Sequence, residues 1–388
     1  MEENGLYGIH ASTTQSFLKL RKDENYITGA EYFAASGTDP GVCVDLLIVD
    51  ECSMIGAELF ELLKEAVHRE YCKVVLFVGD FNQLPPVGES RSPVQDLAHI
   101  FELKEVVRQA RDSYIVKIAT DIRKMISARA YAPPLELIER HASQGVQLFY
   151  DEQKMVDDFC FEEDWYRRDR VIASFRNIDV DRFNGVVRLR YWQGRGNDDP
   201  GQFEVGDGII FQAPNVGDSG FVLHNNGDFA VVKACKRIWS EPLKLWYWRC
   251  KDRADTPFMV VDSGSVSAFQ QKLKRLSSLA RAEESTELRK KYWRTFFLLK
   301  NQFVEVDYRY AMTIHKLQGS TYETVFLNLS DLFARSKDLD MFYRLLYVAI
   351  TRASKHVKIL MPRQTQPDTK KKSISQLEKS LLEIGDIL

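Results

Sequence analysis

The sequence lacks several features that would quickly assign it to a class. No hydrophobic run approaches the ~20 residues of a membrane span, and the polar start MEENG is not a signal peptide. The six cysteines form no CxxC pair and have no histidine at zinc spacing, so reduced thiols are favoured over a metal site. A net charge of −2 gives no global sign of a nucleic-acid binder, although local basic patches would suffice. We therefore expect a globular, cytoplasmic protein without a membrane span.

The most informative stretch is 44–54, VDLLIVDECSM. Its apolar run predicts a strand buried on both faces, as in parallel α/β sheets. Asp50 and Glu51 follow at the carboxyl end, where such sheets bind ligands. In NTP-hydrolysing folds an Asp there holds Mg²⁺ and a neighbouring Glu activates the attacking water. The alternative is a solvated strand end at which two acids happen to meet.

A second strand of the same kind precedes GDFNQLPPVG, residues 79–88. The helical period of 53–71 separates the two strands, which is typical of a parallel sheet. Asp80 and Gln83 should then lie beside the first acid pair, and Gln83 could hydrogen-bond a terminal phosphate and its attacking water. A polar loop closed by prolines is the alternative. Two acid-ending strands separated by one helix favour the functional interpretation.

Changes in composition divide the rest of the chain. A polar, aromatic stretch before the first acid-ending strand predicts a small hairpin or a loop excursion on the surface, and strand–helix alternation resumes after the second acid-ending strand. A segment with antiparallel alternation follows, in which Asn226–Gly227 is a strong hairpin signal. The expected parts are a first α/β domain (1–110, with the insertion at about 19–42), the start of a second (111–190), a small β-barrel with a helical hairpin (191–303), the rest of the second domain (304–362) and a tail helix (363–388).

Three further segments leave alternatives open. The charged, helix-periodic stretch 267–300 is a solvated helical hairpin or a nucleic-acid contact, and the first is favoured. YAMTIHKLQGST (310–321) predicts a loop entering a helix, where His315 alone would more often be structural than functional. RLLYVAITRA (344–353) places Arg352 at the carboxyl end of a helix, pointing away from its own core. The tail stripe from Ile374 favours docking on the body over partner binding.

These motifs, in this order and spacing, resemble the superfamily 1B DNA helicases of the RecD/Dda type. The resemblance covers about 10–360, and six motifs in order make it specific. The matching segments are ASTTQSFLKL, DECSM, GDFNQLPPVG, LKEVVR, TIHKLQGST and LLYVAITRA, with SFRNIDVDRFN opening the second motor domain and HNNGDFAVV in the barrel. The resemblance implies an α/β fold of two RecA-like parallel-sheet domains. The first would be amino-terminally incomplete, and a small barrel with a helical hairpin would be inserted.

The resemblance also implies roles for individual residues, ATP and Mg²⁺ as cofactors, and 5′→3′ movement on single-stranded DNA. Asp50 would bind Mg²⁺ and Glu51 would be the general base, with Gln83 sensing the γ-phosphate. Arg108 and Arg352 would be arginine fingers. The remaining expected contacts are Asp80, Gln318 and Gly319 with nucleotide, and Thr13, Thr313, His315, Lys316 and Ser320 with DNA.

One departure from the family pattern stands out. The phosphate-binding motif Gly-x-x-x-x-Gly-Lys-Ser/Thr occurs nowhere in the 388 residues. Three interpretations follow: a helicase fragment, an inactive nucleic-acid-binding remnant, or one part of a split motor. Expected partners are single-stranded and fork DNA, with a single-strand-binding protein or replisome component in replication or repair. The protein itself is expected to be a monomer.

Overall fold

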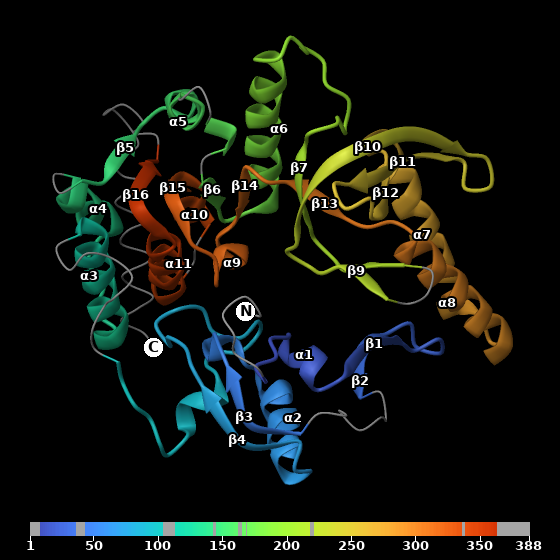
Figure 1. Cartoon of the computed structure of the whole chain (residues 1–388), viewed down its shortest axis with the longest axis horizontal. Coiled ribbons are helices and arrows are strands. Elements are labelled where there is room, and N and C mark those ends of the chain that lie inside the picture. The colour runs from blue at the N-terminus through green and yellow to red at the C-terminus, as the bar shows by residue number, and fades with distance from the viewer. Residues whose placement is uncertain are drawn as a thin grey trace. The chain divides into compact units, whose positions relative to one another are not determined.

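The computed structural model describes residues 8–35, 43–103, 113–142, 145–161, 165–167, 169–217, 221–335 and 338–362. The chain forms two compact units (Figure 1). Unit 1 combines the described residues up to Phe81 with 85–100 and 266–302, and unit 2 contains the rest. Each unit is therefore built from separated stretches of sequence. No helix among the described residues combines the length and apolar character needed to cross a bilayer.

The centre of unit 1 is a two-stranded parallel sheet. Strands β3 (Val44–Val49) and β4 (Cys72–Phe77) pair in register, with Val49 opposite Phe77. Helix α2 (Ala57–His68) connects them, as the helical period predicted. It covers one face of the sheet, where Val49 packs in a cluster with Leu63. Short 3₁₀ helices follow at Cys52–Met54 and Pro93–Asp96.

The other face of this sheet is exposed. Leu46 and Val74, which lie opposite each other, are 48% and 57% exposed, and the pair Ile48 and Leu76 is 58% and 48% exposed. The prediction of strands buried on both faces was therefore wrong. In the described part of unit 1 a helix covers only the α2 side of β3 and β4, so aliphatic side chains of the other side meet solvent.

A β-hairpin and a helical hairpin pack together elsewhere in unit 1. Strands β1 (Leu20–Glu24) and β2 (Glu31–Ala35) are antiparallel and follow the single-turn helix α1 (Thr14–Phe17). Helices α7 (Val266–Ala282) and α8 (Thr286–Asn301) pair with each other. Lys300 Nζ donates to Glu31 (2.7 Å) and Asn301 Nδ2 to Glu24 (2.7 Å). The turn between β1 and β2 therefore lies against the end of α8.

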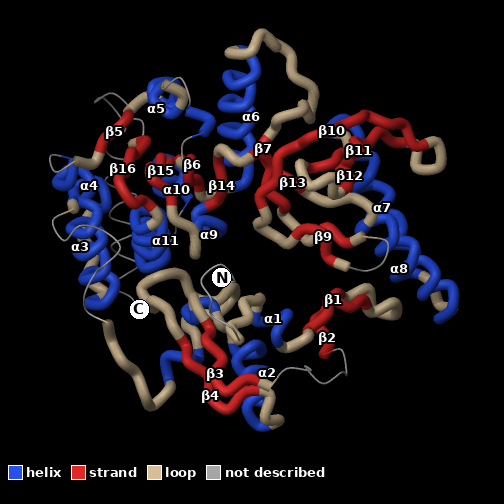
Figure 2. Tube along the Cα trace, viewed as in Figure 1, coloured by secondary structure: helices blue, strands red, loops and turns tan. Residues whose placement is uncertain are grey.

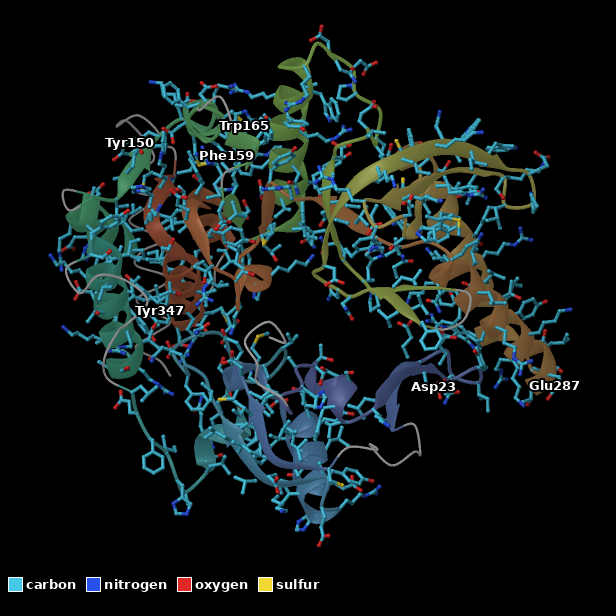
Figure 3. All side chains as sticks on the ribbon, in the orientation of Figure 1. Asp23, Tyr150, Phe159, Trp165, Glu287 and Tyr347 are labelled. Atoms are coloured by element: carbon cyan, nitrogen blue, oxygen red, sulfur yellow. The ribbon has the colours of Figure 1, made fainter. Side chains whose placement is uncertain are left out.

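Unit 2 contains an all-parallel sheet in the order β14-β6-β15-β16-β5. Helices cover both faces, as the two hydrophobic clusters show: one includes residues of α3 and α11, the other residues of α5 and α6. Figure 2 shows these strands enclosed by helices, and Figure 3 labels Phe159 and Trp165, whose rings meet edge-on in the second cluster. The strands are β5 (Gln147–Phe149), β6 (Arg170–Ser174), β14 (Ala311–Thr313), β15 (Tyr322–Asn328) and β16 (Ala353–Leu360).

Proline opens one of the helices that flank this sheet, because α4 begins at Pro134. Proline is tolerated in a first turn because its missing N–H would have no intrahelical partner there. The helices are α3 (Tyr114–Ala128), α4 (Pro134–Ala142), α5 (Glu152–Phe159), α6 (Asn177–Gln193), α9 (Ile314–Leu317), α10 (Leu329–Arg335) and α11 (Leu339–Thr351), with a 3₁₀ turn at Trp165–Arg167.

The predicted antiparallel segment is a five-stranded sheet, in the order β12-β11-β10-β7-β13. Its closure into a barrel stays a prediction. The Asn226–Gly227 turn forms, but the strands on its two sides pair with other strands, so the hairpin prediction was wrong. The strands are β7 (Gly208–Phe211), β10 (Phe229–Ser240), β11 (Leu245–Asp252), β12 (Pro257–Val261) and β13 (Val306–Tyr308), with a separate pair β8 (Asn215–Val216) and β9 (Val222–His224) and a 3₁₀ turn at Ser263–Ser265.

A buried acid anchors this sheet. Asp262 is 5% exposed and accepts hydrogen bonds from Arg237 Nε (2.9 Å) and Trp248 Nε1 (3.0 Å). Burial opposes its ionisation, but the bonds from Arg237 and Trp248 outweigh burial and hold the pKa of Asp262 below its ordinary value. The ionised carboxylate therefore stabilises the folded sheet.

Candidate functional site

The acid pair lies at the carboxyl edge of the β3–β4 sheet. Since the strands are parallel and Val49 is opposite Phe77, both strands end at the same edge. The backbone continues the ladder there: Val78 N donates to Val49 O (2.8 Å) and Cys52 N donates to Val78 O (2.9 Å). Asp50 and Asp80, each just past its strand, are thereby placed at one edge of unit 1.

Glu51 has an unusual backbone and side chain. Its φ of 53° and ψ of 42° lie in the left-handed region, which a residue with a side chain seldom adopts. Asp50 Oδ1 accepts a hydrogen bond from Glu51 N (2.8 Å) and so supports this turn. Glu51 Oε2 is buried and has no hydrogen-bond partner among the described residues. A buried carboxylate oxygen without a donor is costly, which suits a group awaiting a water or a ligand.

Gly79 explains why the loop passes so close to this turn. A Cβ on Gly79 would lie 2.8 Å from both the backbone N and Sγ of Cys52. Any larger residue would push the β4 loop away from the acid pair. Asp80, the next residue, is half-buried and has polar contacts of its own.

Gln83 groups with unit 2, whereas the acid pair belongs to unit 1. Its backbone O accepts a hydrogen bond from Arg344 Nη1 (3.0 Å), and the adjacent Leu84 is 2% exposed in the main cluster of unit 2. Gln83 is 8% exposed, and its Oε1 has no partner among the described residues. Residues 82–84 thus group with unit 2, and the chain returns to unit 1 at Pro85 before it continues in unit 2 from Phe101.

Arg352 lies at the end of α11, as predicted, but its side chain does not point away from its own core. It is 2% exposed and donates to the carbonyl oxygens of Val348 (3.3 Å) and Ser320 (3.3 Å), and to Thr351 Oγ1 (3.2 Å). The prediction was wrong because the carbonyls of the preceding helical turn and of the 318–321 loop attract the guanidinium inward. Arg352 therefore ties the carboxyl end of α11 to that loop.

Thr13 and Thr313 have the same local role, one in each unit. Each is the N-cap of a single-turn helix: Thr13 Oγ1 accepts from Ser16 N (3.1 Å), and Thr313 Oγ1 accepts from Lys316 N (3.4 Å). Thr13 is exposed, whereas Thr313 is 8% exposed. Because the Thr313 hydroxyl is buried and already bonded to Lys316 N, its main effect is to fix the positions of the residues that follow it in α9.

Those neighbours, His315 and Lys316, are exposed. The ring of His315 lies 6.1 Å from that of Phe175, and partial desolvation lowers the pKa of His315. Lys316 Nζ donates to Gln212 Oε1. Burial raises the pKa of Asp307, and the charge of Lys316 opposes that shift. His315 is therefore mostly neutral at pH 7, while Lys316 supplies the positive charge.

Gly319 and Ser320 shape the loop after α9. Gly319 has a φ of +82°, a left-handed conformation that favours glycine. A side chain would meet no atom within 4 Å, so the backbone conformation and not steric crowding explains the glycine. Ser320 contributes its carbonyl to Arg352 (3.3 Å), and Gln318 is half-buried beside it. Arg108 lies outside the described residues.

The residues present fit part of an Mg²⁺–nucleotide site. The exposed Asp50 carboxylate and the unpartnered Glu51 oxygen at one strand edge are oxygen ligands that suit Mg²⁺ or its water. A group of three or more His, Cys, Asp or Glu able to hold a metal is not found in the described part of the chain. The sequence also has no phosphate-binding glycine loop.

Comparison with known proteins supports this interpretation. The AAA domain family matches residues 3–134, and the UvrD-like helicase C-terminal domain family matches residues 308–360. The chain is 25% identical over 385 residues to the ATP-dependent DNA helicase dda of Enterobacteria phage T4, covering 89% of this chain and 82% of the relative. The chain is thus similar to the superfamily 1B helicases of the Dda type along most of its length. The two family matches contain the acid edge at one end of the sequence and the Thr313 and Arg352 segments at the other.

Further similarities extend over most of the chain. An uncharacterized protein of Acanthamoeba polyphaga mimivirus is 19% identical over 420 residues, covering 91% of this chain and 82% of the relative. The crystal structure of Bacteroides Pif1 bound to ssDNA has a TM-score of 0.48 and 14% identity, covering 96% of this chain and 84% of the other. Because that score is below 0.5, the architecture described above rests on the chain's own strands and helices.

Sequence reasoning missed Arg344, which holds the backbone at Gln83. Its guanidinium bonds Gln83 O (3.0 Å) and Asp340 Oδ2 (2.5 Å). The only feature of the sequence that pointed to Arg344 was its position as the first residue of RLLYVAITRA, the motif that also contains Arg352. Its contact with a loop some 260 positions earlier could not be inferred from spacing.

Proposed function

We propose that this protein is the motor portion of an ATP-dependent DNA helicase that moves 5′→3′ on single-stranded DNA. The observation that carries the proposal is the edge of β3 and β4, where Asp50, Glu51 and Asp80 follow two parallel strands. Carboxylates at that edge are what an NTP-hydrolysing site needs for Mg²⁺ and for activating water. The 25% identity to a DNA helicase favours ATP and DNA over other nucleotides and targets.

In this proposal the residues divide the work by unit. Asp50 would hold Mg²⁺, which neutralises phosphate charge, and Glu51 would take the proton of the attacking water at its unpartnered Oε2. Gln83 and Arg352 of unit 2 would respond to the γ-phosphate. Because Arg352 is bonded to Ser320 and the end of α11, it would have to leave these acceptors to reach a phosphate. That release would couple nucleotide binding to the loop that carries the DNA contacts.

The DNA contacts are proposed for the Thr13 and Thr313 segments. Thr13 is exposed at the start of α1, and His315 and Lys316 are exposed beside the Thr313 cap. Contacts of this kind address phosphates and bases without reading sequence, so binding should be tolerant of sequence and sensitive to salt.

The chain alone is proposed to be inactive as an ATPase. Phosphates in such enzymes are held mainly by backbone N–H groups of a glycine loop and by its lysine, and the 388 residues contain no such motif. The exposed aliphatic face of Leu46, Ile48, Val74 and Leu76 favours completion by further polypeptide, in cis or in trans, over a remnant that functions as it is.

Phosphate release with and without single-stranded DNA tests this proposal. The chain as given should show no DNA-stimulated turnover. Adding a polypeptide that supplies a strand, a phosphate-binding loop and a helix should restore it. Robust stimulated turnover by the 388-residue chain would contradict the proposal and require a different phosphate site.

A further inference from the structure

The helical hairpin of α7 and α8 concentrates positive charge in a protein that is slightly acidic. Residues 266–301 contain nine Lys or Arg and three Asp or Glu, a net charge of +6 in a chain of net charge −2. All other residues together therefore carry −8. A local field of this sign attracts polyanions even when the whole protein does not.

The cations of α7 are available for a ligand. In α8, Lys290 pairs with Glu287 (3.4 Å) and Lys300 with Glu31 (2.7 Å). Arg289 donates to the carbonyl oxygen of Glu283 (2.6 Å), and Arg294 lies over the Tyr26 ring. By contrast, the basic residues of α7 make no ion pair with any described carboxylate, and all are exposed or half-exposed. They are Lys272, Lys274, Arg275 and Arg281. A carboxylate next to a surface cation offsets the attraction of that cation for a phosphate, and the α7 cations have no such neighbour among the described ion pairs.

The hairpin is held firmly within unit 1. A Cβ on Gly29, in the β1–β2 turn, would lie 2.2 Å from the Trp293 ring, and Tyr26 meets Phe297 edge-on with centroids 6.0 Å apart. Figure 3 labels Asp23, in β1, and Glu287, at the tip of the helical hairpin. Since α1 packs against β1, one rigid path leads from Thr13 through the β-hairpin to α8. Nucleic acid held at Thr13 could continue past the β-hairpin to the basic helices.

We infer that α7 and α8 bind the phosphate backbone of double-stranded DNA adjoining the single strand. Sites for single strands combine cations with exposed aromatic platforms. In α8, Trp293 and Phe297 are buried, and Tyr292 and Phe296 are half-buried against them, so none of the four rings is fully exposed. Lys272 to Arg281 spans about 14 Å of helix, over which a duplex presents several phosphates at one charge per ~1.7 Å. The inference rests on the proposed DNA helicase function and adds a second, duplex-binding surface.

The experiment measures DNA binding by the full chain without nucleotide. Fluorescence anisotropy compares a labelled blunt duplex of about 20 bp with a labelled single strand over a range of salt concentrations around 0.1 M. The test variant replaces the four α7 cations by Gln. The matched control replaces four exposed cations of unit 1 that are each ion-paired: Lys64, Arg69, Lys73 and Arg91. A third variant replaces Glu283, Glu284 and Glu287 by Gln.

The α7 variant should lose about tenfold or more in duplex affinity near 0.1 M salt, and its salt slope should fall by about 0.9 per lost contact. Single-strand affinity should change by less than about twofold, and the paired-cation control should lose much less duplex affinity. The Glu variant should bind duplex more tightly, which misfolding could not produce. An unchanged duplex affinity and slope in the α7 variant would overturn the inference while leaving single-strand binding, and the proposed function, intact. An equal loss for both DNA forms would also overturn it.

Discussion

Replacing Gly29 by Ala tests how tightly the β1–β2 turn is locked to α8. Gly29 has a φ of +75°, and an added Cβ would lie 2.2 Å from Trp293 Cη2. The left-handed backbone costs Ala about 1–2 kcal/mol, and displacing a ring that is 2% exposed should cost about 1–3 kcal/mol more. Alanine also lowers the conformational entropy of the unfolded chain, which offsets about 0.4–1 kcal/mol of this destabilisation. The expected net destabilisation is about 1.5–4 kcal/mol.

Gly88 provides the matched control in the same unit. Its φ is +81°, and no atom lies within 4 Å of an added Cβ. Gly88→Ala should therefore show the backbone cost alone, about 1 kcal/mol after the unfolded-state gain. The difference of about 1–3 kcal/mol between the two variants isolates the contact with Trp293.

Native-state hydrogen exchange is the suitable assay, because two units make a single unfolding free energy ill defined. Gly29→Ala should lower protection of amides in β1, β2 and α8, and leave the parallel sheet of unit 2 unchanged. Equal protection in the Gly29 and Gly88 variants would refute the packing of the turn on Trp293.

Three further predictions follow. In a version completed with a phosphate-binding loop, Glu51→Gln should keep nucleotide binding but lower turnover on the order of 10²–10⁴-fold, and steady-state kinetics within a few-fold of the parent would exclude Glu51 as the base. Thr313→Ala and His315→Ala should each weaken single-strand binding in anisotropy titrations while Thr313→Ser, which keeps the cap, should not; equal affinities would remove these residues from the DNA path. Asp262→Asn should cost about 2 kcal/mol at pH 7. Because its folded pKa is lowered, Asp262 stabilises above its unfolded pKa and loses that contribution as pH falls through the folded value, so the variant's acid unfolding curve should be flatter below about pH 4.

The features predictable from sequence are those that local patterns determine. The apolar runs before Asp50 and Asp80 placed both strands, and the helical period between them placed α2, so the acid edge was predictable. The loop entering a helix at 310–321 was also predictable, and the structure has the single-turn helix α9 there, capped by Thr313.

What could not be predicted depends on contacts distant in sequence. The inward turn of Arg352 depends on the carbonyl of Ser320, 32 positions earlier. The Asn226–Gly227 turn forms locally. The pairing of its two flanking strands, β9 with β8 and β10 with β7 and β11, depends on strands elsewhere in the sequence. Leu46 and Ile48 are exposed because no described helix packs on their face of the sheet. The residues of a strand cannot show which other elements will pack against it.

The discontinuity of unit 1 has a consequence for its synthesis. The bond between Glu31 and Lys300 cannot form until Lys300, 269 positions later, has been synthesised. At typical translation rates this takes roughly 15–50 s. During this time the turn at Gly29 has no Trp293 to pack against, and an isolated two-stranded hairpin is marginal in water. The β-hairpin should therefore acquire its native rigidity only after α8 has left the ribosome. A nascent chain stalled before α7 should show protease cleavage in β1–β2 that the completed protein resists.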